Sequence, residues 1–275
     1  MSGRRHALLI AVVVAAGAAA IWWNQPPPPA RHNAAAPAVP TAPAPIERPP
    51  AEARPEALIQ HPLDLPATKP PIAAADTGAA LAGLLGRQAV TTFFQLDDFP
   101  RRFVATVDNL GHAHAPPMAW PIHPTPDRFT VEQREGGTVM AAGNSLRYTP
   151  LVLLAERISA THTVDLYLRL YPLLQQAYED LGYPKRYFND RLIAVMDQLL
   201  ATPDAAYPLK VQLTEVKGSV PSVQPWVRYE LTDPALQALA AGQKMLLRVG
   251  PDNQRRLKAR LTAIRQELLS RGPRP

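Results

Sequence analysis

The chain contains no cysteine among its 275 residues. Disulfide frameworks, thiol nucleophiles, zinc ribbons and iron–sulfur clusters all need cysteine, so the sequence excludes them. It also lacks the glycine-rich phosphate and dinucleotide loops, and none of its few serines stands in a G-x-S-x-G or S-x-x-K motif. We therefore expect no cofactor, and we favour a non-catalytic protein over an enzyme.

Proline is abundant instead, with 32 residues, of which 15 lie between Pro26 and Pro71. Residues 24–75 hold these 15 prolines and 14 alanines in 52 positions, a composition typical of a disordered, extended linker. In a polyproline II conformation, at ~3.1 Å per residue, this linker would reach about 160 Å. A proline-rich ligand for an aromatic groove is the alternative, which the sparse charge patterning disfavours.

Residues 7–23 carry no charge. As a helix they would span ~26 Å, close to the ~30 Å of a hydrocarbon core. We predict a transmembrane signal anchor, with Trp22 and Trp23 at one membrane interface. A cleaved signal peptide is the alternative, since the three alanines at 18–20 fit an A-x-A site.

The charges on either side of this span predict its orientation. Residues 1–6 contain Arg4 and Arg5, whereas Arg31 is the only basic residue in the twenty that follow the span. Positive charge is retained on the cytoplasmic side of a membrane. We therefore expect residues 1–6 to form a cytoplasmic tip and the rest of the chain to lie outside the cytoplasm, after a single pass.

From residue 76 the composition is that of a globular protein, and residues 76–272 are predicted to form one domain. The predicted fold class is α+β, mostly helical with two short strand pairs. Alternating residues on either side of Gly136 and Gly137 predict one hairpin, and LKVQLTE and WVRYEL predict the other pair. Apolar spacing and capping residues predict helices over residues 98–110, 145–158, 161–182, 187–203, 233–249 and 251–270.

Two of these helices carry a more specific expectation. Pro172 lies inside the 161–182 pattern and should either kink that helix or divide it. In the closing helix, four apolar residues are spaced four, three and four apart and predict a stripe that faces the core. A two-stranded coiled coil is the alternative, disfavoured because the run covers fewer than three heptads. The stripe consists of Leu257, Leu261, Ile264 and Leu268.

A proline-rich loop carries the candidate metal ligands. Three imidazoles can form an open zinc site, and such a site would make the protein a metal-dependent envelope enzyme. Their spacing matches none of the tight helical zinc signatures, so we expect no metal. The candidates are His112, His114 and His123.

The segment GYPKRYFNDRL, residues 182–192, is the densest cluster of polar and aromatic side chains. Such a cluster can form a recognition surface. Turn chemistry is the alternative, because Gly182 and Pro184 suit a connection between two helices. The candidate recognition residues are Tyr183, Lys185, Arg186, Tyr187, Asp190 and Arg191.

The last 25 residues, from Pro251, carry seven basic side chains against two acidic ones. This excess could bind an anionic cell-wall polymer or lipid headgroups, and a solvated polar face is the alternative. Nucleic acid is not expected, because the domain is predicted to lie outside the cytoplasm. The candidate residues are Arg255, Arg256, Lys258 and Arg260.

Three stretches resemble one family: LLGRQAVTTFFQLDDFPRRFVATVDNL, LYPLLQQAYEDLGYPKRYFNDRLIAVMDQLLATP and DPALQALAAGQKMLLRVGPDN. The chain is similar over residues 76–270 to an uncharacterised bacterial family labelled domain of unknown function 3014. The resemblance implies a short N-terminal span and a variable Pro/Ala-rich linker. It implies no reaction, ligand or catalytic residue. In a bacterium, the charge asymmetry predicts an anchor in the inner membrane and a domain in the periplasm.

The leading hypothesis is therefore a membrane-tethered envelope protein of the bacterial inner membrane. Its helical domain would act as a non-catalytic binding or scaffold module for an envelope protein or an anionic cell-wall partner. The rival hypothesis is the metal-dependent enzyme with the histidine loop. The identity of the ligand and the oligomeric state stay open.

Overall fold

The computed structural model of the chain describes residues 58–65, 69–214 and 228–273. Residues 1–6, the predicted anchor at 7–23 and the linker up to residue 57 lie outside the described residues. Within the described ranges, no helix combines the length and the apolar character needed to cross a membrane.

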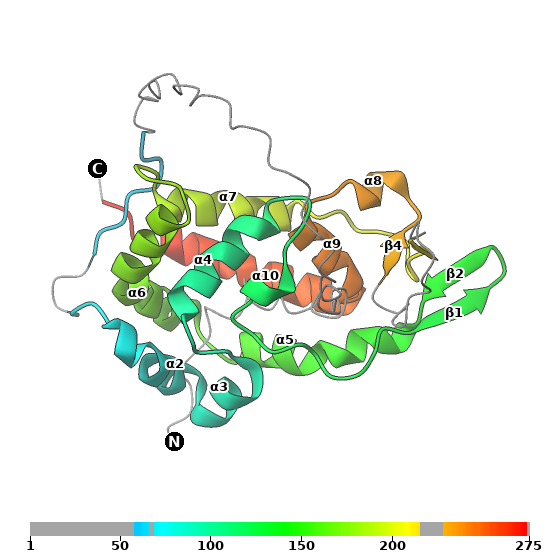
Figure 1. The fold of residues 1–275 in the computed structure, drawn as a ribbon, viewed down its shortest axis with the longest axis horizontal. Helices are drawn as coiled ribbons and strands as arrows, with labels where there is room; N and C mark the ends of the chain where they lie inside the picture. The colour runs from blue at the N-terminus through cyan, green and yellow to red at the C-terminus, as the bar shows by residue number, and fades with distance from the viewer. Residues whose placement is uncertain (1–57, 66–68, 215–227, 274–275) are drawn as a thin grey trace, which may run out of the picture.

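Helices make up most of the domain (Figure 1). The α-helices are α2 (Thr77–Leu85), α3 (Arg87–Phe93), α4 (Phe99–Leu110), α5 (Thr149–Glu156), α6 (Ala160–Asp180), α7 (Phe188–Leu200), α8 (Pro234–Gln237), α9 (Ala241–Arg248) and α10 (Pro251–Leu269). Short 3-10 helices are η1 (Ala74–Asp76), η2 (Pro117–Ala119) and η3 (Ala142–Arg147).

The strands form two antiparallel pairs at one end of the domain, beyond α9 (Figure 1). β1 (Val131–Arg134) pairs with β2 (Gly137–Met140), and β3 (Val211–Leu213) pairs with β4 (Tyr229–Leu231). The Met140 N–H donates to the Leu209 carbonyl at 2.9 Å and joins the two pairs. The first turn depends on glycine, since Gly136 and Gly137 have φ of 90° and 121°. A mostly helical domain with two short strand pairs is thus confirmed for the described residues.

The core lies where α4, α6, α7 and α10 pack together. Phe99 and Phe103 of α4 have ring centroids 6.0 Å apart, and Phe103 meets Phe188 of α7 at 6.2 Å. The predicted stripe of α10 is confirmed, since its four residues are 0–1% exposed. α10 therefore closes the bundle, and its apolar face is not left for a partner.

Two of the predicted helices carried a detail that the structure tests. Pro172 lies inside α6, which is one helix, so of the two predicted outcomes, a kink or a division, the division does not occur. The predicted 233–249 helix is instead two helices, α8 and α9, with Ala240 in an extended conformation between them. The reason is tertiary, because the Ala241 N–H donates to the His112 carbonyl at 2.7 Å and not to a carbonyl of α8.

Candidate functional site

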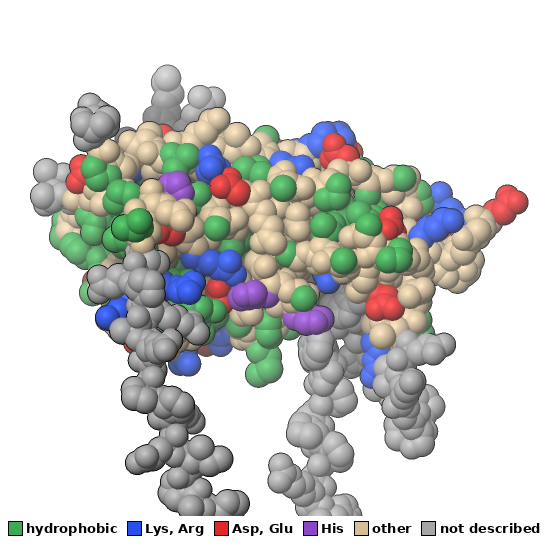
Figure 2. All heavy atoms as spheres, turned by 90° about the horizontal axis from the view of Figure 1, so that it is seen from above, with side chains coloured by type: hydrophobic (Ala, Val, Ile, Leu, Met, Phe, Trp, Pro, Cys, Tyr) green, Lys and Arg blue, Asp and Glu red, His purple; other side chains and the backbone are tan. Residues whose placement is uncertain are grey.

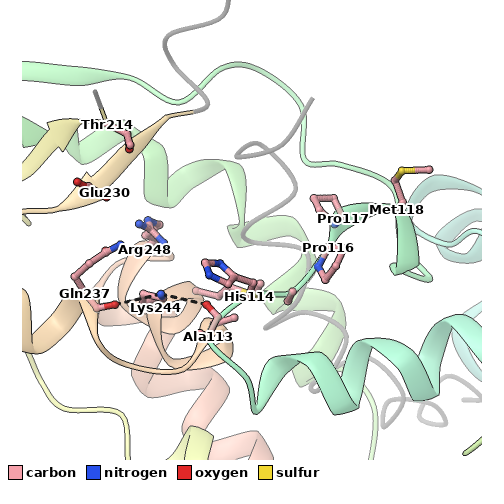
Figure 3. Close-up of a pocket in the computed structure, with 13 residues that line it drawn as sticks. Ala113, His114, Pro116, Pro117, Met118, Thr214, Glu230, Gln237, Lys244 and Arg248 are labelled. Carbon is pink, nitrogen blue, oxygen red and sulfur yellow. Dashed lines mark hydrogen bonds between the residues drawn. The ribbon is translucent and has the colours of Figure 1, made fainter. Parts of the chain in front are cut away.

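A pocket of about 310 Å³ lies where α9 meets the loop of residues 113–118 and the β3–β4 pair (Figure 3). Small-molecule sites typically measure ~300–1,000 Å³, and this pocket falls at the lower end of that range. We term it the α9 pocket. It is lined by the loop, by Ala241, Lys244, Met245 and Arg248 of α9, and by Thr214, Glu230 and Gln237.

A glycine allows α9 to form one wall of this pocket. A Cβ atom on Gly242 would lie 2.5 Å from Leu199 Cδ2 and 3.1 Å from the Leu110 carbonyl oxygen. Only a residue without a side chain permits this approach of α9 to α4 and α7. The loop on the opposite side follows His112. The carbonyl oxygen of His112 accepts a hydrogen bond from the Ala241 N–H in the first turn of α9.

Two cations stand one turn apart on α9 and line the pocket. The Lys244 Nζ donates to the Ala113 carbonyl at 3.3 Å and to the Gln237 carbonyl at 3.2 Å, which accounts for two of its three donors. Burial, and then the charge of Arg248, lowers the pKa of Lys244. Burial lowers the pKa of Arg248 to about 9, so the guanidinium remains charged at neutral pH.

Glu230 is the one carboxylate among the described lining residues. Its Oε1 accepts a hydrogen bond from Gln212 Nε2 at 3.0 Å on the exposed face of the β3–β4 pair. Two cations against one carboxylate leave the described lining with a net positive charge at pH 7.

Most of the remaining wall is apolar, and the polar side chains of His114, Thr214 and Gln237 complete it. In Figure 3 the nitrogen ends of Lys244 and Arg248 lie beside the His114 ring, whereas Pro116, Pro117 and Met118 line the other end. Met118 is 90% exposed, so it stands at the mouth of the pocket. This arrangement suits binding, because apolar walls bury the body of a ligand while a few polar groups fix its orientation.

Two of the predicted recognition residues bind the chain itself. Asp190 accepts hydrogen bonds from the backbone N–H groups of Gln60, at 3.0 Å, and His61, at 2.7 Å. The Tyr187 hydroxyl accepts from the Leu63 N–H at 3.0 Å. Residues 58–65, which we term the strap, belong by sequence to the predicted linker. They are thus held against the end of the α6–α7 turn and the first turn of α7.

Further contacts hold the strap and the residues that follow it. The Asp64 N–H donates to the Arg271 carbonyl at 3.0 Å, beside the end of α10. Lys69 forms an ion pair with Asp165 of α6 at 2.8 Å, and the Ile72 N–H donates to the Arg169 carbonyl at 3.0 Å. Figure 1 shows this blue segment running past the C-terminal end of α10.

The other predicted recognition residues are divided between the interior and the surface. Arg191 and Tyr183 turn toward α4, where Arg191 Nε donates to Asp108 Oδ1 at 2.7 Å and the Tyr183 hydroxyl to Oδ2 at 3.1 Å. Lys185 and Arg186 are exposed in the turn, with Lys185 at a φ of 65°. The structure therefore does not gather the six residues on one surface.

We expect Asp190→Ala to release the strap while the domain stays folded. The substitution removes the acceptor for two backbone N–H groups at the surface, each worth about 1 kcal/mol. Amide hydrogen exchange at Gln60 and His61, followed by mass spectrometry, should accelerate. Asp180→Ala is the matched control, because that carboxylate accepts from the Gln176 side chain alone among the hydrogen bonds found. Unchanged exchange at residues 60 and 61 would contradict the expectation.

Three of the four basic residues predicted to bind an anionic partner contact a neighbouring helix or loop, and Arg255 pairs with a residue of α10 itself. Arg256 makes two hydrogen bonds with the Glu156 carboxylate, at 2.7 and 2.5 Å. Arg260 donates to the Ile158 carbonyl, Lys258 to the Thr202 carbonyl, and Arg255 to Asp252. On the face seen in Figure 2, basic and acidic side chains are interspersed over the visible described surface.

Arg256→Gln is expected to change the dependence of the unfolding free energy on pH in the acidic range. The hydrogen bond from Arg256 is the main cause that lowers the pKa of Glu156 below 4.5. A lowered folded-state pKa means that the stabilisation is present above pH 4.5 and is lost as the pH falls through the folded-state pKa. In the variant, the pKa of Glu156 should return toward 4.5, and the acid-dependent loss of stability should shrink.

The effect on the unfolding free energy should stay below ~1 kcal/mol, because both side chains are partly exposed. A carboxyl NMR titration of Glu156 and thermal melts from pH 3 to pH 7 measure the two quantities. Arg101→Gln removes the same charge from α4 and should leave the Glu156 titration unchanged. A Glu156 pKa that does not move in the Arg256 variant would refute this assignment.

The histidines of the loop do not converge. His112 Nδ1 lies 3.9 Å from Asp108 Oδ2, His114 lines the α9 pocket, and the His123 N–H donates to the Phe93 carbonyl at 2.9 Å. In the part of the chain that the structure describes, no three His, Cys, Asp or Glu side chains are grouped so that they could hold a metal ion.

The pocket cations were not among the residues predicted from the sequence. Lys244 and Arg248 are four residues apart in the apolar stretch ALQALAAGQKMLLRV, a spacing that places them on one helix face. That spacing was the available signal. It does not reveal the loop of residues 113–118, which is more than a hundred positions away and completes the site.

The fold and the pocket define a small, mostly helical α+β domain with an amphipathic pocket beside its strand pairs, into which two cationic side chains of α9 project. The chain belongs to the family described as protein of unknown function (DUF3014), whose family model matches residues 99–265, more than half of its length. The resemblance seen in the sequence is thereby confirmed. No curated protein and no solved structure matches the chain.

Proposed function

We propose that the protein is a membrane-tethered, non-catalytic binding module of the bacterial envelope and that the α9 pocket is its ligand site. The observation that carries the proposal is the polarity of this pocket, with Lys244 and Arg248 at one end and Pro116 to Met118 at the other. Convergent charges in an otherwise apolar concavity are typical of binding sites.

The tether is supported by the sequence of residues 7–23 and by the proline-rich linker behind it. The strap shows where the chain that follows the predicted linker attaches to the domain. Residues 58–65 are hydrogen-bonded to the domain beside the start of α7, which fixes this part of the chain on the domain surface. In this proposal, the membrane lies at the far end of the linker and the pocket faces the periplasm.

Site-specific photo-crosslinking in intact cells tests the binding role. A photoreactive residue in place of Met118, at the mouth of the pocket, should yield a defined adduct. The same residue in place of Leu146 is the control, because Leu146 is 71% exposed and does not line the pocket. Adducts that are identical at both positions, or absent at Met118, would refute the α9 pocket as the ligand site.

Fractionation tests the tether. The full chain should remain in the membrane pellet after a carbonate wash, and protease added to spheroplasts should digest the domain. Recovery of the domain in the cytoplasmic fraction would refute the proposed location. Recovery as a soluble periplasmic product that begins near Ile21 would refute the retained anchor and leave export standing.

A further inference from the structure

The domain holds the strap by its main chain. Each backbone N–H group from residue 60 to residue 64 donates a hydrogen bond to the domain, except at position 62, where proline has no N–H. The acceptors are Asp190 for residues 60 and 61, the Tyr187 hydroxyl for residue 63 and the Arg271 carbonyl for residue 64. Every peptide carries such main-chain groups, so these contacts do not depend on the strap's own side chains.

A buried amide adds a donor for the strap carbonyl. Asn189 Nδ2 donates to the His61 carbonyl at 2.8 Å, and Asn189 Oδ1 accepts from the Tyr167 hydroxyl at 3.1 Å. Asn189 and Tyr167 are each 1% exposed, and the Tyr167 hydroxyl fixes the direction in which the Asn189 amide donates. A buried donor left without a partner costs free energy, so Asn189 requires a carbonyl at this point. We term Tyr187, Asn189, Asp190 and the Arg271 carbonyl the strap site.

The strap side chains contribute at alternate positions, as in an extended chain. His61 and Leu63 are partly buried, and Leu63 packs against the main core, whereas residues 60, 62 and 64 are exposed. The site therefore suits an extended segment with an apolar residue at the position of Leu63. Proline suits the position before it, because it has no N–H to satisfy and its φ is already fixed.

We propose that the strap site is a docking site for an extended, proline-containing segment of a partner protein, and that the strap is its occupant in cis. The partner segment presents the same main-chain donors and a Pro-Leu pair. In Figure 1 the strap runs beside the C-terminal end of α10, whereas the α9 pocket lies beside the strand pairs at the other end of the domain. The strap site is therefore a second site, which does not depend on the function proposed for the α9 pocket.

The strap is attached in a way that permits exchange. The family model over residues 99–265 includes the three side chains of the strap site but not the strap, so the occupant comes from outside the matched domain. Leu58, Ile59 and Leu65 are 90%, 54% and 44% exposed, so the strap is held mainly at residues 60–64. A surface segment held by hydrogen bonds can open without unfolding the core. A partner segment competes with an attached strap, whose effective concentration is on the order of millimolar.

A labelled peptide tests the strap site on the full chain in lipid nanodiscs. The probe is a fluorescent peptide with the sequence of residues 58–65, and anisotropy, corrected with empty nanodiscs, measures its binding. Gln60→Pro combined with His61→Pro removes both N–H donors to Asp190 and leaves the strap site intact; we term this the strap variant. We expect it to bind the probe about tenfold or more tightly than the unaltered chain, whose own strap occupies the site.

Matched variants locate the contact. Leu58→Pro combined with Ile59→Pro introduces the same two prolines where the N–H groups donate to none of the described residues, and should leave probe binding as weak as in the unaltered chain. Asp190→Ala added to the strap variant should weaken probe binding by about tenfold or more, because the carboxylate accepts two N–H groups. Asp180→Ala added in the same way should leave it unchanged.

A second probe isolates the main-chain donors. It carries N-methyl groups on the amides that correspond to residues 60 and 61, so it keeps every side chain and lacks the two N–H groups. We expect it to bind the strap variant about tenfold or more weakly than the plain probe.

Amide hydrogen exchange at Leu63 and Asp64 should accelerate in the strap variant, and thermal melts verify that the domain stays folded. Unchanged exchange would contradict the hydrogen bonds on which the proposal rests. Probe binding no tighter than in the unaltered chain would overturn it, as would equal binding of the two probes. Retention of the unaltered chain on an immobilised strap variant would assign the site to the strap of a second copy and overturn the partner segment. The α9 pocket is tested separately, by the Met118 adduct.

Discussion

Truncation of the chain before Pro251 is expected to abolish cooperative unfolding of the domain, because it removes α10. The four residues of the α10 stripe are 0–1% exposed, and full burial of one leucine or isoleucine stabilises by ~1.5–3 kcal/mol. The helix packs against α5, α6 and α7 at once, so its loss uncovers all three. The summed loss is comparable with the ~5–15 kcal/mol that stabilises a typical domain.

Circular dichroism during heating, for the full and the shortened chain, measures this result. A single substitution gives a graded version, since Leu261→Ala at a fully buried site should cost ~2.7–5 kcal/mol. Leu269→Ala is the control on the same helix, because Leu269 is 39% exposed and should cost less than ~1 kcal/mol. A shortened chain that melts cooperatively at an unchanged temperature would mean that α10 does not close the core.

Asp108→Ala is expected to destabilise the domain by about 3 kcal/mol, because it removes the partner of a largely buried charge. The Asp108 side chain is 8% exposed and that of Arg191 is 24% exposed. Arg191 also donates through Nη2 to the Asp108 carbonyl at 2.7 Å. A Cβ atom on Gly111 would lie 2.8 Å from that same nitrogen, so the guanidinium is confined and cannot easily turn to solvent.

Urea denaturation of the variant measures the loss. Asp97→Ala is the matched control, because that carboxylate is 82% exposed in its pair with Arg102, and exposed pairs contribute ~0–1 kcal/mol. Tyr183 supplies a local readout. Burial, and then the hydrogen bond to Asp108, raises the pKa of Tyr183 above 10.0, so that pKa should fall in the Asp108 variant. Equal destabilisation by the two substitutions would refute the role of Asp108.

The elements that the sequence predicts well are those determined by neighbours along the chain. Asp233 and Pro234 predict the start of α8 as its capping residue and its first residue. In the structure, the Asp233 carboxylate accepts a hydrogen bond from the Ala235 N–H at 2.8 Å. Gly136 and Gly137 mark the first hairpin for the same local reason. The break between α8 and α9 was missed, because its cause is the His112 carbonyl, a partner from another part of the chain.

The partners of the polar side chains also depend on distant segments and not on neighbours along the chain. The six residues of the predicted recognition surface are polar in sequence, yet Arg191 faces Asp108 and Asp190 faces the strap. The sequence shows which side chains are charged, but it does not show which groups they face in the folded domain. The candidate site shows this most clearly, since it joins α9 to a loop whose residues carry no binding motif of their own.

By itself, the sequence determined the family, the mostly helical α+β class, the two strand pairs and the buried face of α10. Each of these depends on periodicity and on capping or turn residues, which act over a few positions. Only the tertiary structure decided that the strap binds the start of α7, that the basic residues of α10 pair within the domain, and that Lys244 and Arg248 line a pocket. These features need contacts between distant segments, and such contacts exist only once the core has brought those segments together.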